Sequence, residues 1–242
     1  MLLPDLDYDP TESAVPWKKL YDDNHTITFS TPSGNVAYAD ERLVFKGFSL
    51  LSPLFMTKKS DLKKYQLMIE AMEGQSVLAL DCIDPSMYDA LLIPGGHAQG
   101  VKALLESDDA YRICRHFMSE DKPVAAVCHG VLLLARTTAN DGTSVLHSRK
   151  TTSLTNTLEF PAWLLTAPWL GRYYRTYNKS VESEVRAAIG GKGTFLSGPL
   201  FPIRDSHTNT APGFIVRDGN YLSARWPGDC NRFAQEFAKM LD

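Results

Sequence analysis

Paired cysteines, basic runs and long apolar segments are all missing from this sequence. Its four cysteines form no Cys-x-x-Cys pair, which argues against a zinc ribbon or a thioredoxin-type redox site. Its 25 lysines and arginines are nearly balanced by 28 acidic residues, and no Lys/Arg-rich run offers a footprint for nucleic acid. No window approaches the ~20 apolar residues that a membrane helix needs. We therefore expect a small-molecule or protein partner, with no nucleic acid and no membrane.

The amino-terminal segment also lacks the marks of a targeting signal. The residues "MLLPDLDYDP" contain neither a basic region nor a long apolar stretch, unlike a secretory signal peptide. The six histidines show no metal-ligand spacing, so we expect no metal site, and we expect no other cofactor. These observations favour a cytoplasmic protein with reduced thiols.

Short apolar runs alternate with amphipathic segments as far as about residue 140. This rhythm is typical of β-α units around a mostly parallel sheet, and a hydrophobic content of 44% is enough for a sizeable core. We expect an α/β fold in a single domain of residues 1–242. The clearest expected strands are "YDALLIPGG" and "PVAAV", and the clearest expected helices cover residues 12–23, 60–74 and 227–242.

The second half of the chain is less regular, and we expect residues 155–212 to form an insertion in the domain. Its stretch "TLEFPAWLLTAPWLGRYYRTYN" is rich in aromatic residues, and Pro161 and Pro168 are expected to break it into short helices. These would form a cap or a partner surface. Pro16 is compatible with the first helix only if it lies in the first turn. Asp218-Gly219 predicts a tight hairpin between two strands.

The stretch "PVAAVCHGVLLLAR" places a cysteine between an expected strand and an expected helix. A nucleophile on such a corner needs a tight turn, and the residues two positions before and after it must be small. Here they are Ala126 and Gly130, so Cys128 fits a small-x-Cys-x-Gly elbow. A helix N-terminus favours thiolate over thiol, and ligands bind at the carboxyl ends of parallel strands. The alternative is an inert buried cysteine.

An oxyanion site needs two backbone N–H groups aimed at one point. The amide of His129 directly follows Cys128 and is one candidate. The turn "IPGGH" supplies the other through Gly95 or Gly96, because glycine allows close approach of the backbone. His97 ends this turn and is a candidate for lining the pocket. The alternative is an ordinary glycine turn.

Two titratable groups expected near this edge of the sheet are candidates for carrying a proton. The imidazole of His129 is one candidate, with Asp205 or Asp229 as carboxylates that would orient it. Glu12 is the other candidate, because it follows the first expected strand, "MLLP". If Glu12 points at Cys128, burial and a nearby thiolate would raise its pKa, and it could shuttle a proton. Its alternative role is that of a helix cap.

Taken together, "DPTESAVP", "ALLIPGGHAQG" and "KPVAAVCHGVLLLA" resemble the ThiJ/PfpI superfamily, whose fold is like that of class I glutamine amidotransferases. The family pattern has an acidic residue with a proline four positions later, a Pro-Gly-Gly turn and a cysteine elbow, here Glu12 with Pro16, Pro94 to Gly96, and Cys128. The resemblance covers most of the chain except residues 40–75 and 155–212. It implies a flavodoxin-like three-layer sandwich that assembles as a homodimer or higher oligomer.

The resemblance also implies a range of activities for Cys128. The adjacent His129 and the segment "TTSLTNTLE" are similar to the chaperone/glyoxalase branch, which implies conversion of a 2-oxoaldehyde into a 2-hydroxy acid without glutathione. Amidase, other hydrolase or isonitrile hydratase activity at the same cysteine is the alternative enzyme reading. A stress-response chaperone or a redox sensor is the alternative outside enzymes. The region "RWPGDCNRF" has no histidine, which argues against a complete amidotransferase triad.

Overall fold

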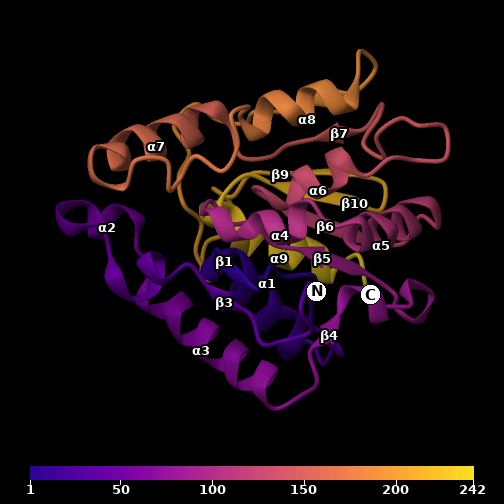
Figure 1. Cartoon of the computed structure of the whole chain (residues 1–242), viewed down its shortest axis with the longest axis horizontal. Helices are drawn as coiled ribbons and strands as arrows, with labels where there is room; N and C mark the ends of the chain where they lie inside the picture. The colour runs from indigo at the N-terminus through magenta and orange to yellow at the C-terminus, as the bar shows by residue number, and fades with distance from the viewer.

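A four-stranded sheet forms the centre of the protein, whose 242 residues are all described by a computed structural model (Figure 1). Its order is β5–β6–β10–β9, with β6 pairing in parallel with both β5 and β10. The β9–β10 pair is an antiparallel hairpin in which Gly219 has a φ of 63°, as Asp218-Gly219 predicts. The bounds of these strands are Leu91–Ile93 (β5), Val124–Val127 (β6), Ile215–Asp218 (β9) and Tyr221–Ala224 (β10).

The amino-terminal residues contact this sheet at the β5 edge. The amide of Leu2 donates to the carbonyl of Leu92 at 3.0 Å, and the amide of Leu3 donates to Ser30 at 2.9 Å. The segment "MLLP" was expected to be the first strand, but it only contacts the sheet, with an isolated bridge between Leu2 and Ser30, and the first strand begins at Leu6. The remaining strands form three parallel pairs, β1 (Leu6–Tyr8) with β3 (Tyr38–Ala39), β2 (Ser30–Thr31) with β4 (Leu78–Ala79), and β7 (Lys150–Thr151) with β8 (Thr194–Phe195).

Helices cover both faces of the central sheet. Every residue of β6 and β10 is therefore buried. Helix α1 packs against α3 and α9, and α6 packs against α4, α5 and α8. This is the expected three-layer α/β sandwich with a mostly parallel sheet. The helices are α1 (Pro10–Asp22), α2 (Ser52–Phe55), α3 (Lys59–Glu73), α4 (Lys102–Leu105), α5 (Asp108–Ser119), α6 (Gly130–Arg136), α7 (Asn156–Leu170), α8 (Val181–Ile189) and α9 (Cys230–Ala238).

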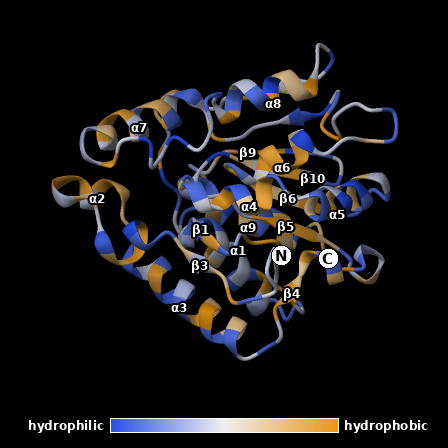
Figure 2. Ribbon diagram, in the orientation of Figure 1, coloured by the Kyte–Doolittle hydropathy of each residue, from blue (hydrophilic) through white to orange (hydrophobic).

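The main hydrophobic core lies between these layers. Figure 2 shows hydrophobic residues concentrated on β5, β6 and α6, and polar residues on the outer helices. A second, smaller core joins α1 to α3 around Trp17, Met68 and Met72. None of the helices combines the length and the apolar character needed to cross a membrane.

Three expectations about prolines are wrong. Pro16 lies in the interior of α1, and α7 is one continuous helix that runs through both Pro161 and Pro168. A proline inside a helix removes one backbone N–H donor, a loss that the rest of the helix can outweigh when it is long and well anchored. The segment that we expected to form several short helices is therefore a single α-helix of 15 residues.

Helices α7 and α8 anchor each other through reciprocal carboxylates. Glu182 of α8 accepts a hydrogen bond from the amide of Asn156 at 2.8 Å, and Glu159 of α7 accepts one from the amide of Val181 at 2.9 Å. Each carboxylate satisfies an amide at the N-terminus of the other helix, where no partner exists within the helix. This pairing fixes the start of α7 despite its two prolines.

Candidate active site

Cys128 lies on a sharp corner between β6 and α6. Its φ is 57°, a left-handed conformation that is uncommon for a residue with a side chain. Gly130 makes the corner possible, because a Cβ there would lie 2.4 Å from the carbonyl oxygen of Ile93. Ala126 is fully buried beneath it. The two small residues of the sequence pattern, Ala126 and Gly130, therefore both lie in the tightly packed surroundings of Cys128.

Glu12 approaches this corner from the first turn of α1. Asp9 caps that helix, accepting hydrogen bonds from the amides of Thr11 at 2.8 Å and Glu12 at 3.0 Å, so the cap is not Glu12 itself. The Glu12 side chain is buried, and its Oε2 accepts a hydrogen bond from the amide of Gly95 at 3.1 Å. Its Oε1 has no hydrogen-bond partner.

Gly95 packs closely against both Glu12 and Cys128. A Cβ at this position would lie 2.7 Å from Oε2 of Glu12, 2.8 Å from Cβ of Cys128 and 2.8 Å from the amide nitrogen of His129. Only glycine fits among these groups. Its amide is engaged by Glu12, so Gly95 holds the carboxylate and is not free to bind an oxyanion.

Two other candidate oxyanion donors remain. The amides of Gly96 and His129 make no hydrogen bond to the backbone of the protein. The amide of His129 faces the sulfur of Cys128 and lowers the pKa of its thiol. Gly96 lines the same cavity as Cys128. These two amides are the pair whose positions suit a developing negative charge beside Cys128.

Burial dominates the electrostatics of Cys128 and Glu12. It raises the pKa of the Cys128 thiol well above its usual range, and the carboxylates of Glu12 and Asp9 raise it further. Burial and the two carboxylates therefore outweigh the helix terminus that was expected to favour the thiolate, and Cys128 is only 4% exposed. Burial, followed by repulsion from Asp9, raises the pKa of Glu12 as well. The pair cannot carry two negative charges at neutral pH, so it retains a proton.

Both histidines next to the thiol are held neutral. Nδ1 of His129 lies 3.6 Å from Sγ of Cys128, and burial lowers the pKa of the His129 imidazole well below its ordinary value. The ring of His97 lies 4.9 Å from that of His129, and burial lowers the pKa of His97 to about 4. A neutral imidazole has one nitrogen free to accept a proton. His129 is therefore placed as a proton acceptor for the thiol.

Neither aspartate considered for orienting His129 does so. Asp229 is buried and forms a two-point ion pair with Arg225, with both N–O distances at 2.9 Å. Asp205 accepts hydrogen bonds from Asn231 at 2.8 Å and from the amide of Arg232 at 2.7 Å. Both carboxylates fasten the start of α9 to the preceding segment.

A cavity of about 300 Å³ opens above Cys128. Glu12, Gly96, His97 and Cys128 contribute to it, which brings together residues from three separate sequence motifs. Much of the remaining lining is apolar and comes from α7 and from the segment around α2. No group of three or more His, Cys, Asp or Glu side chains is arranged as a metal site in the protein.

The cavity wall includes Tyr174, a residue of the aromatic-rich stretch for which the sequence predicts no role in the site. Its ring lies 5.5 Å from that of His97, and its hydroxyl donates to Asp40 at 2.5 Å. Tyr173 donates to the same carboxylate at 3.0 Å. Asp40 follows β3, so this contact joins the segment before α2 to the segment after α7. No local motif could have revealed a contact between residues so far apart in the chain.

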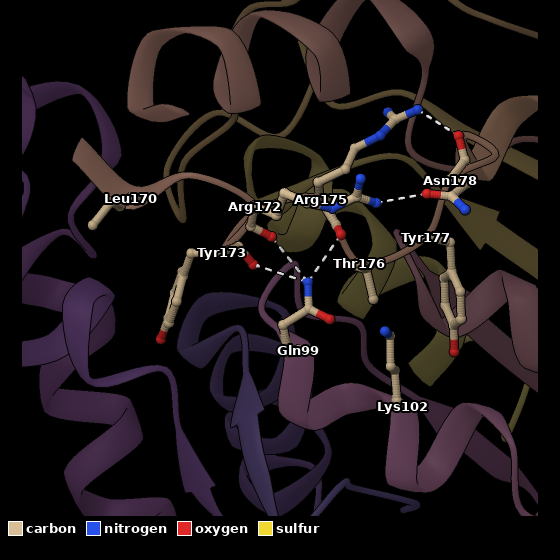
Figure 3. Close-up of a pocket in the computed structure, with 9 residues that line it drawn as sticks. All are labelled: Gln99, Lys102, Leu170, Arg172, Tyr173, Arg175, Thr176, Tyr177 and Asn178. Carbon is tan, nitrogen blue, oxygen red and sulfur yellow. Dashed lines mark hydrogen bonds between the residues drawn. The ribbon is translucent and has the colours of Figure 1, made fainter. Parts of the chain in front are cut away.

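A second hollow, of about 490 Å³, lies beside the loop that carries Tyr174 (Figure 3). None of its nine lining residues is a cysteine, histidine or acidic residue. At its centre the side-chain amide of Gln99 donates to the carbonyls of Arg172 at 3.0 Å and Arg175 at 2.9 Å. Gln99 thus ties the loop to the turn after Gly96, and we assign this hollow a structural role in positioning Tyr174.

The fold and the corner cysteine define a class of α/β proteins that carry a cysteine elbow at the carboxyl edge of a parallel sheet. The family described as ThiJ/PfpI family-like matches residues 3–189, and the chain belongs to this family. Deglycase TK1284 of Thermococcus kodakarensis is 28% identical over 205 residues, which cover 81% of this chain and 93% of that protein. Deglycase PfpI of Pyrococcus furiosus is 30% identical over 180 residues, which cover 72% and 76%.

Solved structures agree on the fold. The crystal structure of glyoxalase III from Candida albicans matches with a TM-score of 0.70 over 97% of this chain and 88% of that one. Its sequence identity is 16%, so this likeness concerns the fold alone.

Proposed function

We propose that this protein is a cysteine-dependent enzyme that converts a 2-oxoaldehyde into a 2-hydroxy acid without glutathione. The observation that carries the proposal is that Cys128, Glu12 and Gly96 line one cavity, with the amide of His129 facing the sulfur of Cys128. The deglycase relatives support an enzyme, since their name denotes one.

The first step forms a bond between sulfur and the aldehyde carbon. His129 Nδ1, 3.6 Å from Sγ, takes the thiol proton as Cys128 attacks, and the π electrons of the carbonyl move to its oxygen. The amides of His129 and Gly96 hold this oxyanion. The His129 imidazolium then gives this proton to the oxygen, which yields a neutral hemithioacetal and leaves Glu12 as the carboxylate.

The second step moves a proton between two carbons. The Glu12 carboxylate takes the proton from the carbon bonded to sulfur, which leaves an enediolate with its charge on the former ketone oxygen. The hydroxyl proton on the carbon bonded to sulfur moves to that oxygen. Glu12 then returns its proton to the neighbouring carbon, and the carbon bonded to sulfur becomes a carbonyl. The product is a thioester of the 2-hydroxy acid on Cys128. Water then attacks the thioester carbonyl, the carbon–sulfur bond breaks, and the thiol regains its proton. The sum is one oxoaldehyde plus one water giving one hydroxy acid, with no oxidant or reductant.

A second candidate is release of the same acid from adducts of oxoaldehydes with thiols or amines. The names of the relatives with 28% and 30% identity favour this deglycase reaction. It uses the same cysteine, and it differs in whether the substrate enters free or as an adduct.

The test supplies purified protein with methylglyoxal in heavy water without glutathione, and follows the product by NMR. We expect lactate, with deuterium at its second carbon where the transferred proton exchanges with solvent. A parallel sample receives methylglyoxal premixed with a thiol, which distinguishes the free aldehyde from the adduct. Absence of lactate from both samples would refute the proposed function.

A further inference from the structure

Two segments far apart in the sequence supply most of the apolar wall of the cavity above Cys128. The segment around α2 contributes Leu43, Phe48, Leu54 and Phe55, and α7 contributes Leu158 and Leu165 among others. Figure 1 shows α2 and α7 on the same side of the central sheet, and Figure 2 shows hydrophobic residues on both helices. The reactive groups come instead from β6, from α1 and from the turn after β5.

The wall contains a cluster of aromatic rings. The ring of Phe48 lies 5.3 Å from that of Phe55 and 5.7 Å from that of Tyr174, and all three residues line the cavity. Rings at such separations attract further aromatic groups in stacked or edge-on arrangements. This part of the wall suits a flat apolar group better than water or a charged group.

The cavity is larger than a three-carbon oxoaldehyde requires. Its volume of about 300 Å³ corresponds to roughly ten water molecules at about 30 Å³ each. Methylglyoxal bound to Cys128 fills a small part of this space and leaves the apolar wall in contact with water. An apolar substituent on the substrate would displace that water, which is favourable in proportion to the area covered.

The mouth of the cavity has apolar side chains that remain open to solvent. Leu54 is 64% exposed and Leu165 is 45% exposed, although both line the cavity. Arg204 is the one lysine or arginine in the lining, and its charge lowers the pKa of Asp9 and Glu12. Its guanidinium also lies 5.3 Å from the ring of Trp226, so it already has partners.

We infer that the preferred substrate is a 2-oxoaldehyde with a bulky apolar substituent, such as an aromatic or cyclohexyl ring. The inference rests on the proposed function. The aldehyde reaches Cys128, and the ring lies between the α2 segment and α7, against Phe48 and under Leu54 and Leu165.

The first test compares kcat/KM for methylglyoxal, phenylglyoxal and cyclohexylglyoxal with the full-length protein. Cyclohexylglyoxal separates apolar contact from the electronic effect of a conjugated ring. We expect both ring substrates to exceed methylglyoxal by at least roughly tenfold, the scale that a few buried methylene groups give. If methylglyoxal is turned over as well as or better than both, the inference is wrong while the proposed function stands. If none of the three is turned over, the proposed function itself fails.

The second test locates the apolar substituent with matched leucine variants. Leu165→Asn and Leu54→Asn change exposed positions that line the cavity, so folding is not at risk. Leu164→Asn and Leu50→Asn are the controls, since these residues are 67% and 94% exposed and do not line it. We expect the lining variants to lower the ratio of cyclohexylglyoxal to methylglyoxal kcat/KM by roughly fivefold to tenfold, and the controls to leave it unchanged. Equal ratios in all four variants would overturn the inference.

Discussion

Nδ1 of His129 lies 3.6 Å from Sγ of Cys128, although the two residues are adjacent in the chain. Neighbouring side chains on a corner need not meet, and here the left-handed φ of Cys128 allows the sulfur to turn toward the imidazole. The same turn directs the His129 amide at the sulfur. One residue is therefore placed to supply both a proton acceptor and an oxyanion donor.

Replacing Glu12 by Gln should make the Cys128 thiol more reactive but slow the turnover of oxoaldehyde. The carboxylate of Glu12 raises the pKa of Cys128, so Glu12→Gln should lower that pKa and make the thiol react faster with iodoacetamide near neutral pH. Turnover of oxoaldehyde should nevertheless fall by roughly a hundredfold or more, because the proton carrier is lost. Peptide-resolved mass spectrometry separates Cys128 from the exposed Cys82. Glu73→Gln, at an exposed position, is the control, and parallel loss of thiol reactivity and turnover would contradict the assigned role.

The rate should follow a bell-shaped curve against pH. The active state of the Cys128–Glu12 pair has lost some but not all of its protons, and burial raises the pKa of both groups. Because Glu12 must be ionised to take the carbon-bound proton and burial raises its pKa, kcat/KM should fall as pH decreases below neutrality. It should fall again at alkaline pH when the last proton leaves. A flat profile across the neutral and acid range would show that this pair does not control the reaction.

Gly95→Ala tests the close packing between Glu12 and Cys128. The added Cβ would lie within 2.8 Å of three neighbouring atoms, so the neighbours must move. We expect a loss of about 1–3 kcal/mol in the free energy of unfolding, measured by urea denaturation, together with a large loss of turnover. Gly191→Ala is the matched control, because nothing lies within 4 Å of the Cβ position there. Equal stability of the two variants would mean that the turn has room to adjust.

Tyr174→Phe should weaken the contact between the two segments that form the cavity wall. Its hydroxyl donates to Asp40, and removing one partner of a buried hydrogen bond costs about 1–3 kcal/mol. A double-mutant cycle with Asp40→Asn should show coupling between the two positions, and KM should rise because Tyr174 lines the cavity. Tyr21→Phe is the control, at a ring that is 58% exposed. Additive effects of Tyr174→Phe and Asp40→Asn would contradict a direct contact.

His97 should make a contribution to stability that is lost in mild acid, opposed by Asp9, whose pKa burial raises to about 6. Burial lowers the pKa of His97 from 6.5 to about 4, so the unfolded chain takes up a proton in this window and the folded protein does not. The contribution of His97 to the free energy of unfolding should therefore be fully retained above pH 6.5 and should fall as pH decreases toward 4. His97→Gln should flatten this slope, whereas His207→Gln, at an exposed residue, should not. An unchanged slope in His97→Gln would place the acid sensitivity elsewhere.

The cysteine corner could be predicted from the sequence because a tight turn requires small residues only at nearby positions. Ala126 and Gly130 stand two positions from Cys128, and steric fit at a tight turn depends on such near neighbours. The Asp218-Gly219 hairpin was readable for the same reason, since the turn residues themselves determine the backbone conformation. The continuous apolar strand "PVAAV" similarly indicated burial on both faces.

The remaining features depend on groups that the fold brings together from distant parts of the chain. Asp40 and Tyr174 are 134 positions apart, and no periodicity links them. The pKa of Cys128 is raised by burial and by Glu12 and Asp9, which outweigh a helix terminus that sequence alone shows. Helix α7 starts at an amide that donates to Glu182, a contact between separate helices.

The most direct test of Cys128 as the nucleophile is turnover of a 2-oxoaldehyde by matched cysteine variants. Cys128→Ala should lose at least about a thousandfold in kcat, the scale seen when a covalent nucleophile is removed. Cys82→Ala changes an exposed cysteine outside the cavity and should retain the wild-type rate. Formation of 2-hydroxy acid by Cys128→Ala at the wild-type rate, with its fold intact by circular dichroism, would contradict the role given to Cys128.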